Sequence, residues 1–160
     1  MSGIHSSFLY RKRIAATVAA AAAVVAALAV AGSVETKKPV QADGLPQAAQ
    51  TFMATYCAGE VPVLVLREYD DFRRSYEATL VDGTKIKFRR SGEWTSFESH
   101  ARPVPAALIP AQVTEYLDAN FPGAVVKQIL RDRNEIEVGL DNRVELTFDS
   151  RTFLLTDFDD

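Results

Sequence analysis

Side chains that could carry out nucleophilic or metal chemistry are scarce in this chain of 160 residues. Beyond residue 31 there is one histidine, His100, and one cysteine, Cys57. Ser99 precedes His100, but nothing around the pair matches a nucleophile elbow, so we interpret His100 as a solvated histidine of a connecting segment. A single cysteine excludes an intramolecular disulfide and a zinc site built from cysteine pairs. We therefore predict no catalytic residue, no metal ligand and no cofactor, and we do not expect an enzyme.

Two further side chains have ordinary structural explanations. Cys57 falls on the apolar stripe of a predicted helix, where a buried thiol behaves as a small hydrophobic group. Trp94 begins a predicted strand and is expected to cover the core rather than to anchor a ligand. The sequence has no glycine-rich phosphate-binding loop. Its many acidic residues cannot be assigned acid and base roles without geometry.

The composition is that of a soluble globular protein, with 48% hydrophobic and 24% charged residues. Residues 43–160 contain 13 Lys and Arg against 20 Asp and Glu, a formal charge of −7. Nucleic-acid binding requires a basic domain or a basic stripe, and this part of the chain has neither. We therefore exclude nucleic acid as a partner.

The first 31 residues have the pattern of an export signal. A basic stretch, Arg11-Lys12-Arg13, precedes residues 14–31, which carry no charge and end in the small-x-small pattern of a signal-peptidase site. Two alternatives stay open. Cleavage could instead follow Ala42, or the apolar run could be kept as a membrane anchor, since its 18 residues are near the minimum for a span. In each case the domain is expected outside the cytoplasm, periplasmic or secreted. Residues 32–44 are polar and are predicted to be a flexible tether.

The chain repeats one pattern of apolar residues, and the second copy follows the first at a distance of 64 residues. Each copy begins with an apolar residue and a proline, Leu45-Pro46 and Ile109-Pro110. The positions that follow have the spacing of one face of an amphipathic helix: Ala49, Phe52, Met53, Tyr56 and Cys57, then Val113, Tyr116, Leu117, Asn120 and Phe121. Proline fits the first turn of a helix, because its missing N–H would have no partner there. The sequence therefore predicts two equivalent helices.

Four strand-like runs follow each helix. They are residues 61–69, 74–81, 84–90 and 93–98 in the first copy, and residues 125–131, 135–140, 144–149 and 152–158 in the second. Apolar residues alternate with polar ones, so the sheet should have one buried and one solvated face. The middle strands correspond at a distance of 60 rather than 64, which places an extra loop at residues 70–73 of the first copy.

These elements predict an α+β fold made of two tandem α-β4 units. We place the first unit at residues 45–98, a stiff proline-containing linker at residues 99–108, and the second unit at residues 109–160. A single copy of about 60 residues would bury too little apolar surface to be secure alone. We therefore expect one antiparallel sheet of about eight strands, with both helices packed on the same face.

The best-defined part of the repeat lies in the middle strands. The first copy reads Tyr76-Glu77-Ala78-x-Leu80-x-Asp82-Gly83-x-x-Ile86-x-Phe88 and then Ser91-Gly92-x-Trp94, and the second echoes it as Glu137-Val138-x-Leu140 and Leu146-x-Phe148-Asp149. With the paired helix openings, this pattern resembles the beta-lactamase-inhibitor-like, PepSY-like family of exported bacterial proteins. The resemblance implies tandem helix-plus-strand units and a periplasmic setting, and it implies no established activity. The second copy departs from the pattern at Arg143, which stands where the first has Gly83.

The solvated face of the predicted sheet differs in charge between the copies. We predict pairing of Leu80 with Ile86 and of Leu140 with Leu146, across turns at Asp82-Gly83-Thr84 and Asn142-Arg143. The outward partners are then Val81–Lys85, Thr79–Lys87 and Glu77–Arg89 in the first copy, and Asp141–Glu145, Gly139–Thr147 and Glu137–Asp149 in the second. The first copy is thus basic, while the second has directly opposed acidic pairs, which cost stability.

The candidate partner-binding face consists of Lys85, Lys87, Arg89, Glu137, Asp141, Glu145 and Asp149. An ordinary solvated face is the simplest explanation of these charges. The functional explanation is a surface for a protein or peptide of the envelope, with calcium binding at the acidic end and head-to-tail self-association as alternatives. Our leading hypothesis is a non-enzymatic binding module, inhibitor-like in the version that the resemblance implies. The alternative is an envelope scaffold or assembly protein held at the membrane by residues 14–31.

Overall fold

The structure, a computed structural model, describes residues 36–70 and 73–159. The predicted signal or anchor in residues 1–31 lies outside the described residues, and so do residues 71–72 at the centre of the predicted extra loop. No helix in the described part of the chain is long and apolar enough to span a membrane.

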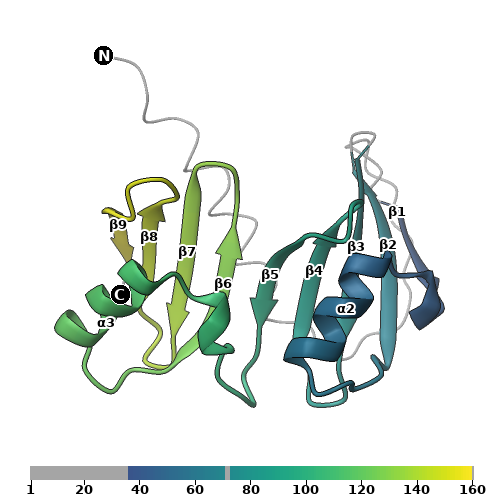
Figure 1. Cartoon of the computed structure of the whole chain (residues 1–160), viewed down its shortest axis with the longest axis horizontal. Coiled ribbons are helices and arrows are strands. Elements are labelled where there is room, and N and C mark those ends of the chain that lie inside the picture. Colours follow the sequence, from purple (N-terminus) through teal and green to yellow (C-terminus); the bar gives the residue numbers. More distant parts are fainter. Residues whose placement is uncertain (1–35, 71–72, 160) are drawn as a thin grey trace, which may run out of the picture. The chain divides into compact units, whose positions relative to one another are not determined.

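One antiparallel sheet holds nine strands of the described chain, and each strand pairs with the next one along the sequence (Figure 1). The strands are β1 (Thr36–Val40), β2 (Leu64–Asp70), β3 (Arg73–Thr79), β4 (Lys85–Arg89), β5 (Trp94–Glu98), β6 (Val126–Arg131), β7 (Glu135–Leu140), β8 (Glu145–Asp149) and β9 (Leu155–Asp159). The helices are α2 (Gln47–Tyr56) and α3 (Ala111–Asn120), and two short 3-10 turns are η1 (Ala42–Gly44) and η2 (Ala106–Leu108). The predicted fold class, an α+β domain with one antiparallel sheet and two helices, is confirmed.

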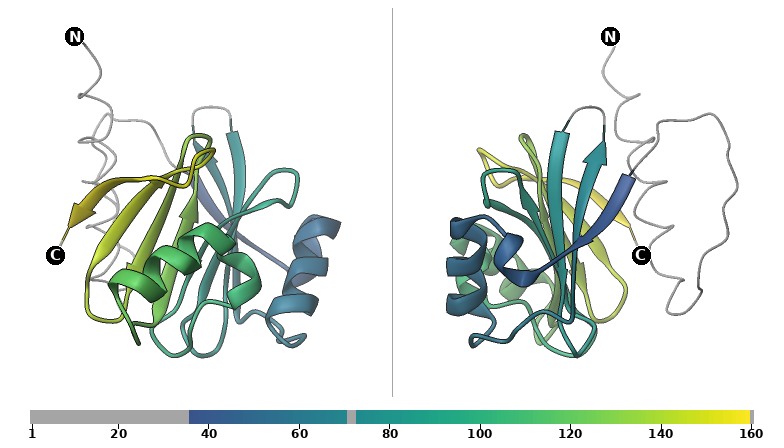
Figure 2. Two further views of the ribbon diagram at one scale, coloured as in Figure 1. Left: turned by 60° about the vertical axis from the view of Figure 1, so that its left-hand side comes forward. Right: turned by 90° about the vertical axis from the view of Figure 1, so that its right-hand side faces the viewer.

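Both helices lie on the same side of the sheet (Figure 2). Each follows a proline and buries the apolar stripe that the sequence predicts, with Phe52 and Met53 inward on α2 and Val113 and Leu117 inward on α3. This is the physical reason for the packing, because an amphipathic helix removes its apolar stripe from water only against another apolar surface. Among the described elements, the opposite face of the sheet has no helix over it. We call that opposite side the outward face.

One aromatic contact occurs in both repeats with nearly the same geometry. The rings of Phe52 on α2 and Phe88 on β4 are 5.5 Å apart and inclined at 81°. Their counterparts, Tyr116 on α3 and Phe148 on β8, are 5.4 Å apart and inclined at 80°. The helix residues are separated by 64 positions and the strand residues by 60, as the repeat predicts. The two copies therefore share a packing arrangement as well as a sequence pattern.

Residues 36–40 form an edge strand, whereas the polar sequence of residues 32–44 predicts a flexible tether. β1 pairs along its whole length with β2. Val40 packs against the core, and the Lys37 ammonium lies 2.9 Å from a carboxylate oxygen of Glu68. The tether prediction is wrong for this segment because the strand is stabilised mainly by ladder hydrogen bonds, which leave no apolar pattern in the sequence. The sheet consequently has nine strands rather than about eight.

The hairpin registers differ by two residues from the predicted ones. The observed pairs are Ala78–Ile86 and Val138–Leu146, in place of Leu80–Ile86 and Leu140–Leu146. Each hairpin closes through a three-residue loop, residues 81–83 and 141–143, whereas the predicted pairing placed the loop one residue later. The last loop residue has a positive φ in both cases, +84° at Gly83 and +72° at Arg143. Because the shift is even, each strand side chain keeps its predicted face while its cross-strand partner changes.

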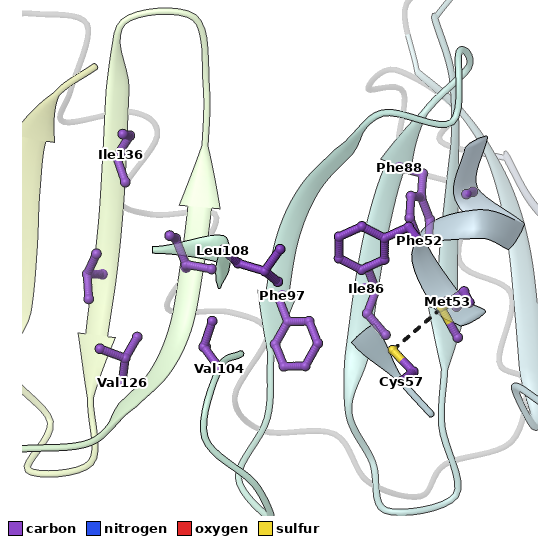
Figure 3. Close-up of a cluster of buried hydrophobic side chains, with 14 of the residues drawn as sticks. Phe52, Met53, Cys57, Ile86, Phe88, Phe97, Val104, Leu108, Val126 and Ile136 are labelled. Atoms are coloured by element: carbon purple, nitrogen blue, oxygen red, sulfur yellow. Dashed lines mark hydrogen bonds between the residues drawn. The ribbon is translucent and has the colours of Figure 1, made fainter. Parts of the chain in front are cut away.

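The apolar core continues from one repeat into the other across β5 and β6. Phe97 of β5 is fully buried and lies opposite Ile129 of β6 in the ladder. Val104 and Leu108, from the segment predicted as a linker, are only 4% and 6% exposed. Figure 3 shows Phe97, Val104 and Leu108 between the side chains of α2 and those of β6 and β7. The connecting segment therefore fills the core between the repeats, and the two repeats bury one common cluster of side chains.

Candidate functional site

The cations predicted to make the first repeat basic lie beside carboxylates. The pairs are Lys87–Glu77 (Nζ to Oε2, 3.7 Å), Arg89–Glu93 (Nη1 to Oε2, 3.3 Å) and, opposite each other in the β4–β5 ladder, Lys85 and Glu98. Neighbouring opposite charges cancel each other's field at a distance. The outward face of the first repeat is therefore charge-balanced, which corrects the prediction of a basic half. The error follows from the register, because the predicted pairing set Lys87 opposite Thr79 rather than Glu77.

The outward face of the second repeat carries two carboxylates at each of three levels of its ladder. They are Glu135 opposite Asp149, Glu137 and Asp157 on either side of Thr147, and Glu145 opposite Asp159. Directly opposed side chains have Cβ atoms roughly 5 Å apart, so the like charges repel at the two levels where carboxylates are directly opposed, Glu135–Asp149 and Glu145–Asp159. Strands β7, β8 and β9 contain no lysine or arginine. This half of the face is acidic, as the sequence indicates, although the opposed pairs differ from the predicted ones.

Two residues of the predicted acidic surface also hold local structure. Asp141 lies in the β7–β8 loop rather than in the ladder, and its Oδ1 accepts a hydrogen bond of 3.1 Å from the Val125 N–H. Asp149 Oδ1 accepts hydrogen bonds from the Thr152 N–H (2.8 Å), the Arg151 N–H (3.0 Å) and the Thr152 hydroxyl (3.0 Å). These donors lower the pKa of Asp149, the Thr152 N–H having the largest effect. Asp141 therefore leaves the candidate face, and Asp149 stays ionised while it shapes the turn before β9.

Polar side chains join the connecting segment to the first repeat. The Arg102 guanidinium donates to both carboxylate oxygens of Glu60 (2.7 and 3.2 Å) and to Asp82 Oδ2 (2.6 Å), a set that we call the Arg102 clamp. Behind it, the buried Thr84 hydroxyl donates to Ser99 Oγ at 2.8 Å. The bonds to Glu60, and then to Asp82, raise the pKa of Arg102 further above its usual range. Burial alone would raise the pKa of Asp82, but hydrogen bonds from Thr84 and Arg102 outweigh it and lower that pKa.

The three side chains assigned structural roles from the sequence behave as predicted. His100 is exposed, with 82% of its side chain accessible. Cys57 is fully buried, and burial is the main cause that raises the pKa of its thiol to about 11, so the thiol stays protonated at neutral pH. Trp94 is half-buried against Phe52, with ring centroids 5.8 Å apart, and the Arg131 guanidinium lies 4.9 Å from the Trp94 ring.

A second charged feature, absent from the sequence predictions, lies on the helix side of the β2–β3 hairpin. The guanidinium groups of Arg67 and Arg74 lie over the Tyr69 ring, 5.6 Å and 5.3 Å from its centroid. Lys38 of β1 is directly opposite Arg67 in the ladder and faces the same side. We call Lys38, Arg67, Tyr69 and Arg74 the Tyr69 cluster. Two guanidinium groups thus share one aromatic ring, and a third cation lies opposite one of them in the ladder.

The sequence does contain a signal for this cluster. Arg67 and Tyr69 share the strand face of the buried Val65, and Arg74 shares the face of the buried Ala78. Arginine at an inward position is unusual, because inward positions are normally apolar. The alternation of β2 and β3 therefore marks the two arginines, but the approach of both to one ring depends on the register, which the sequence does not supply.

No group of three or more His, Cys, Asp or Glu side chains in the described part of the chain is arranged to hold a metal ion. This holds for the acidic residues of β7–β9 as well. The calcium alternative therefore has no preformed site in residues 36–70 and 73–159.

Comparisons with known proteins agree with this architecture. A family model described as "Putative beta-lactamase-inhibitor-like, PepSY-like" matches residues 74–156. A putative periplasmic protein of the DUF2874 family from Bacteroides vulgatus is 35% identical over 78% of this chain and 97% of its own, with a TM-score of 0.74. A putative calcium-regulated periplasmic protein from Bacteroides thetaiotaomicron is 37% identical with the same coverage and TM-score. Another putative periplasmic protein of unknown function from Bacteroides vulgatus is 27% identical over 78% of this chain and all of its own, also with a TM-score of 0.74. No curated protein sequence matches the chain.

Proposed function

This chain belongs to the PepSY-like, beta-lactamase-inhibitor-like family, and from that premise we propose that it is a non-enzymatic binding module of the cell envelope. The binding surface is the acidic outward face of the second repeat, and the partner is a protein or peptide with a basic surface. A periplasmic location is supported by the solved structures that resemble the chain, which are named as putative periplasmic proteins.

The proposal rests on a difference in charge between the two halves of the outward face. In the first repeat each of the three outward cations of β4 stands beside a carboxylate. In the second repeat carboxylates face each other, as Glu135 and Asp149 do and as Glu145 and Asp159 do. Opposed like charges cost up to about 1 kcal/mol per pair relative to neutral residues, so the arrangement opposes folding stability. A cationic partner relieves that repulsion, and electrostatic complementarity of this kind steers association and gives specificity.

The fold supports a protein partner rather than a small molecule. Both helices cover the other face of the sheet, and no helix of residues 36–70 and 73–159 lies over the broad outward face (Figure 2). A catalytic role has no support from the side chains, because the only described histidine is solvent-exposed and the only described cysteine is buried as a protonated thiol. The description of the matching family names no catalytic function.

The experiment compares the wild-type chain with two matched double variants as bait in an envelope extract. Glu135→Gln/Glu145→Gln removes two carboxylates from the outward face, and Glu115→Gln/Asp118→Gln removes two from the exposed side of α3. We expect a bound protein that is kept by the α3 variant and lost by the sheet variant, with weaker binding as salt is raised. Capture of the same proteins by all three baits contradicts the proposal.

A calcium titration of the same three proteins separates the remaining alternatives. One relative is named as calcium-regulated, so calcium is the ion to test. Calcium binding that the sheet variant abolishes and the α3 variant preserves, with no difference in captured protein, would replace the protein partner with the ion. The scaffold alternative predicts instead that the chain stays in the membrane fraction whichever variant is used.

A further inference from the structure

We propose that the Tyr69 cluster is a binding site for a phosphate group, separate from the acidic outward face of the second repeat. The cluster lies on the other side of the sheet and in the other repeat. Figure 1 shows the β2–β3 hairpin extending past the end of α2, so the helix that covers the lower part of these strands does not cover this end. The cluster is therefore cationic rather than acidic, and it lies on the opposite face of the sheet, in the first repeat rather than the second.

The cations of the cluster have no counter-charge in the described part of the chain. Lys37, one residue before Lys38, is paired with Glu68 at 2.9 Å, and Arg89 and Arg102 are paired as well. Among the side chains that the structure describes, in residues 36–69 and 73–159, no carboxylate lies within ion-pair distance of the three cations, which are Lys38, Arg67 and Arg74. Cations held side by side repel each other, so the arrangement favours an anion between them.

The Nε atoms of both guanidinium groups also lack hydrogen-bond acceptors. Three enclosed side-chain polar atoms of the described residues have no hydrogen-bond partner, and two of them are Arg67 Nε and Arg74 Nε. The third, Glu68 Oε1, lies 2.9 Å from the Lys37 ammonium, so an ion pair compensates it even though the geometry is not that of a hydrogen bond. Native proteins leave few buried donors unpaired, and an unpaired group calls for an explanation such as a missing ion. Both unexplained donors belong to one cluster, which makes a common ligand the simplest explanation.

The chemistry of the cluster favours phosphate over a single carboxylate. A guanidinium presents a planar fork of donors that binds two oxygens of one anion. A carboxylate has two oxygens in one plane and is satisfied by one such fork. A phosphate has more oxygens in a tetrahedral arrangement and up to two negative charges, so it can accept from two guanidinium groups and an ammonium together. The Tyr69 ring holds both guanidinium groups by cation–π contact, which reduces the freedom lost when an anion binds.

The equivalent hairpin of the second repeat lacks this arrangement and serves as an internal control. Arg131 stands 64 residues after Arg67, but its guanidinium lies over Trp94 of β5. Arg133 stands where the first repeat has Tyr69, so the aromatic ring is missing. Each hairpin therefore has at least two arginines, but only in the first do two of them lie over a single ring.

The test is a titration of the protein, as purified from cells, with inorganic phosphate at constant ionic strength. The variant Arg67→Gln/Arg74→Gln keeps the length and polarity of the side chains and removes both charges. We expect phosphate binding about 10-fold weaker or more, because a hydrogen bond to a charged group contributes on that scale. The matched control, Arg131→Gln/Arg133→Gln, removes the same charge from the equivalent hairpin and should bind phosphate as the wild type does. Lys38→Gln, on an exposed edge position, should weaken binding about threefold and does not depend on the hairpin core.

Two further arms identify the source of the phosphate. Vesicles of phosphatidylcholine with added phosphatidylglycerol test a lipid headgroup, and inorganic phosphate alone tests the free ion. Loss of either interaction in the Arg67→Gln/Arg74→Gln protein, but not in the control, supports the site and names its source. Phosphate and vesicle binding that are equal in all variants overturn it. Binding of a hexaglutamate peptide that depends on the same arginines, with no binding of phosphate, overturns the assignment of the ligand class.

Discussion

The two repeats bury equivalent side chains and differ in how they use polar ones. In the first repeat, Asp82 of the β3–β4 loop and the buried Thr84 belong to the contacts that hold the connecting segment. The corresponding positions of the second repeat are Asn142 and Val144, which make no equivalent connection. The second repeat instead places opposed carboxylates on the outward face. Packing constrains the inward positions in both copies. The loops and outward positions differ: those of the first copy bind the connecting segment, and those of the second carry acidic side chains.

The largest effect is expected from removing an equivalent buried side chain from the core of each repeat. Phe88→Ala and Phe148→Ala each remove a fully buried ring that packs against a helix, and each should lower the free energy of unfolding by about 3–5 kcal/mol. Since the core is continuous through Phe97, each variant should still unfold in one transition. Urea denaturation followed by circular dichroism measures both quantities. Two separate transitions, with the unchanged repeat unfolding as in the wild type, would show that the repeats are independent.

The Arg102 clamp attaches the connecting segment to the first repeat, and the described residues of the second repeat have no equivalent. Arg102→Gln should lower the free energy of unfolding by about 1–2 kcal/mol, a value reduced from that of a buried pair because the side chain is 31% exposed. The matched control is Arg143→Gln in the second repeat, which loses an exposed cation from the corresponding loop region and should change stability by less than about 0.5 kcal/mol. Equal effects of the two changes in urea denaturation would contradict a special role for the clamp.

The same clamp predicts a dependence on pH. The folded-state pKa of Asp82 lies below its ordinary value of 3.8, so its contribution is fully present above that value and is lost as the pH falls through the folded-state pKa. The stability difference between wild type and Asp82→Asn should therefore shrink as the pH falls below about 4 and through the folded-state pKa. Urea denaturation over that range measures it. A difference that stays constant would mean that Asp82 is not held as a carboxylate by the clamp.

Substitutions at the last residue of each hairpin loop should change the free energy of unfolding by a smaller amount, and in opposite directions in the two repeats. Gly83 and Arg143 both have positive φ, which glycine adopts freely and arginine does not. Gly83→Ala should cost about 1 kcal/mol through the backbone alone, because a Cβ at this position meets no atom within 4 Å. Arg143→Gly should stabilise by about 0.5 kcal/mol, since relief of strain exceeds the added freedom of the unfolded chain. Thermal melting of both variants decides the signs.

The smallest expected effect concerns the outward charges. Glu145→Gln should raise the free energy of unfolding by a few tenths of a kcal/mol, because it removes repulsion from the opposed Asp159. Glu93→Gln should lower it by a similar amount, because it breaks the exposed pair with Arg89. Measurements at low and high salt should bring both differences toward zero. Effects of the same sign would remove the distinction between a charge-balanced and an acidic half.

The sequence predicts the elements of this fold well because apolar periodicity records burial. The stripe through Phe52 and Met53 indicates α2, and the alternation through Ile136 and Val138 indicates β7. The register was predicted two residues away because the position of the loop depends on the backbone at Gly83, which does not change the apolar pattern. Even shifts preserve the face of every side chain, so the inward positions were predicted correctly while the ion pairs were not.

The candidate sites were harder to predict for the same reason. Whether Lys87 is paired with Glu77 depends on register, and whether Arg67 and Arg74 share the Tyr69 ring depends on register and side-chain conformation together. The acidic half was predictable because β7, β8 and β9 contain no cation, so any register leaves it acidic.

Strand β1 sets a limit on where the chain can be shortened by processing. It occupies Thr36–Val40 and forms the outer ladder of β2, which would otherwise present seven residues of unpaired backbone to other chains. Cleavage after Ala31 leaves this strand on the mature protein, whereas cleavage after Ala42 removes it and, with it, Lys38. A protein cut at the later position would keep its two helices and eight strands but would expose an adhesive edge. Of the two cleavage positions, eleven residues apart, the earlier leaves the edge of the sheet covered by β1 and the later leaves β2 as an exposed edge that can pair with a strand of another chain.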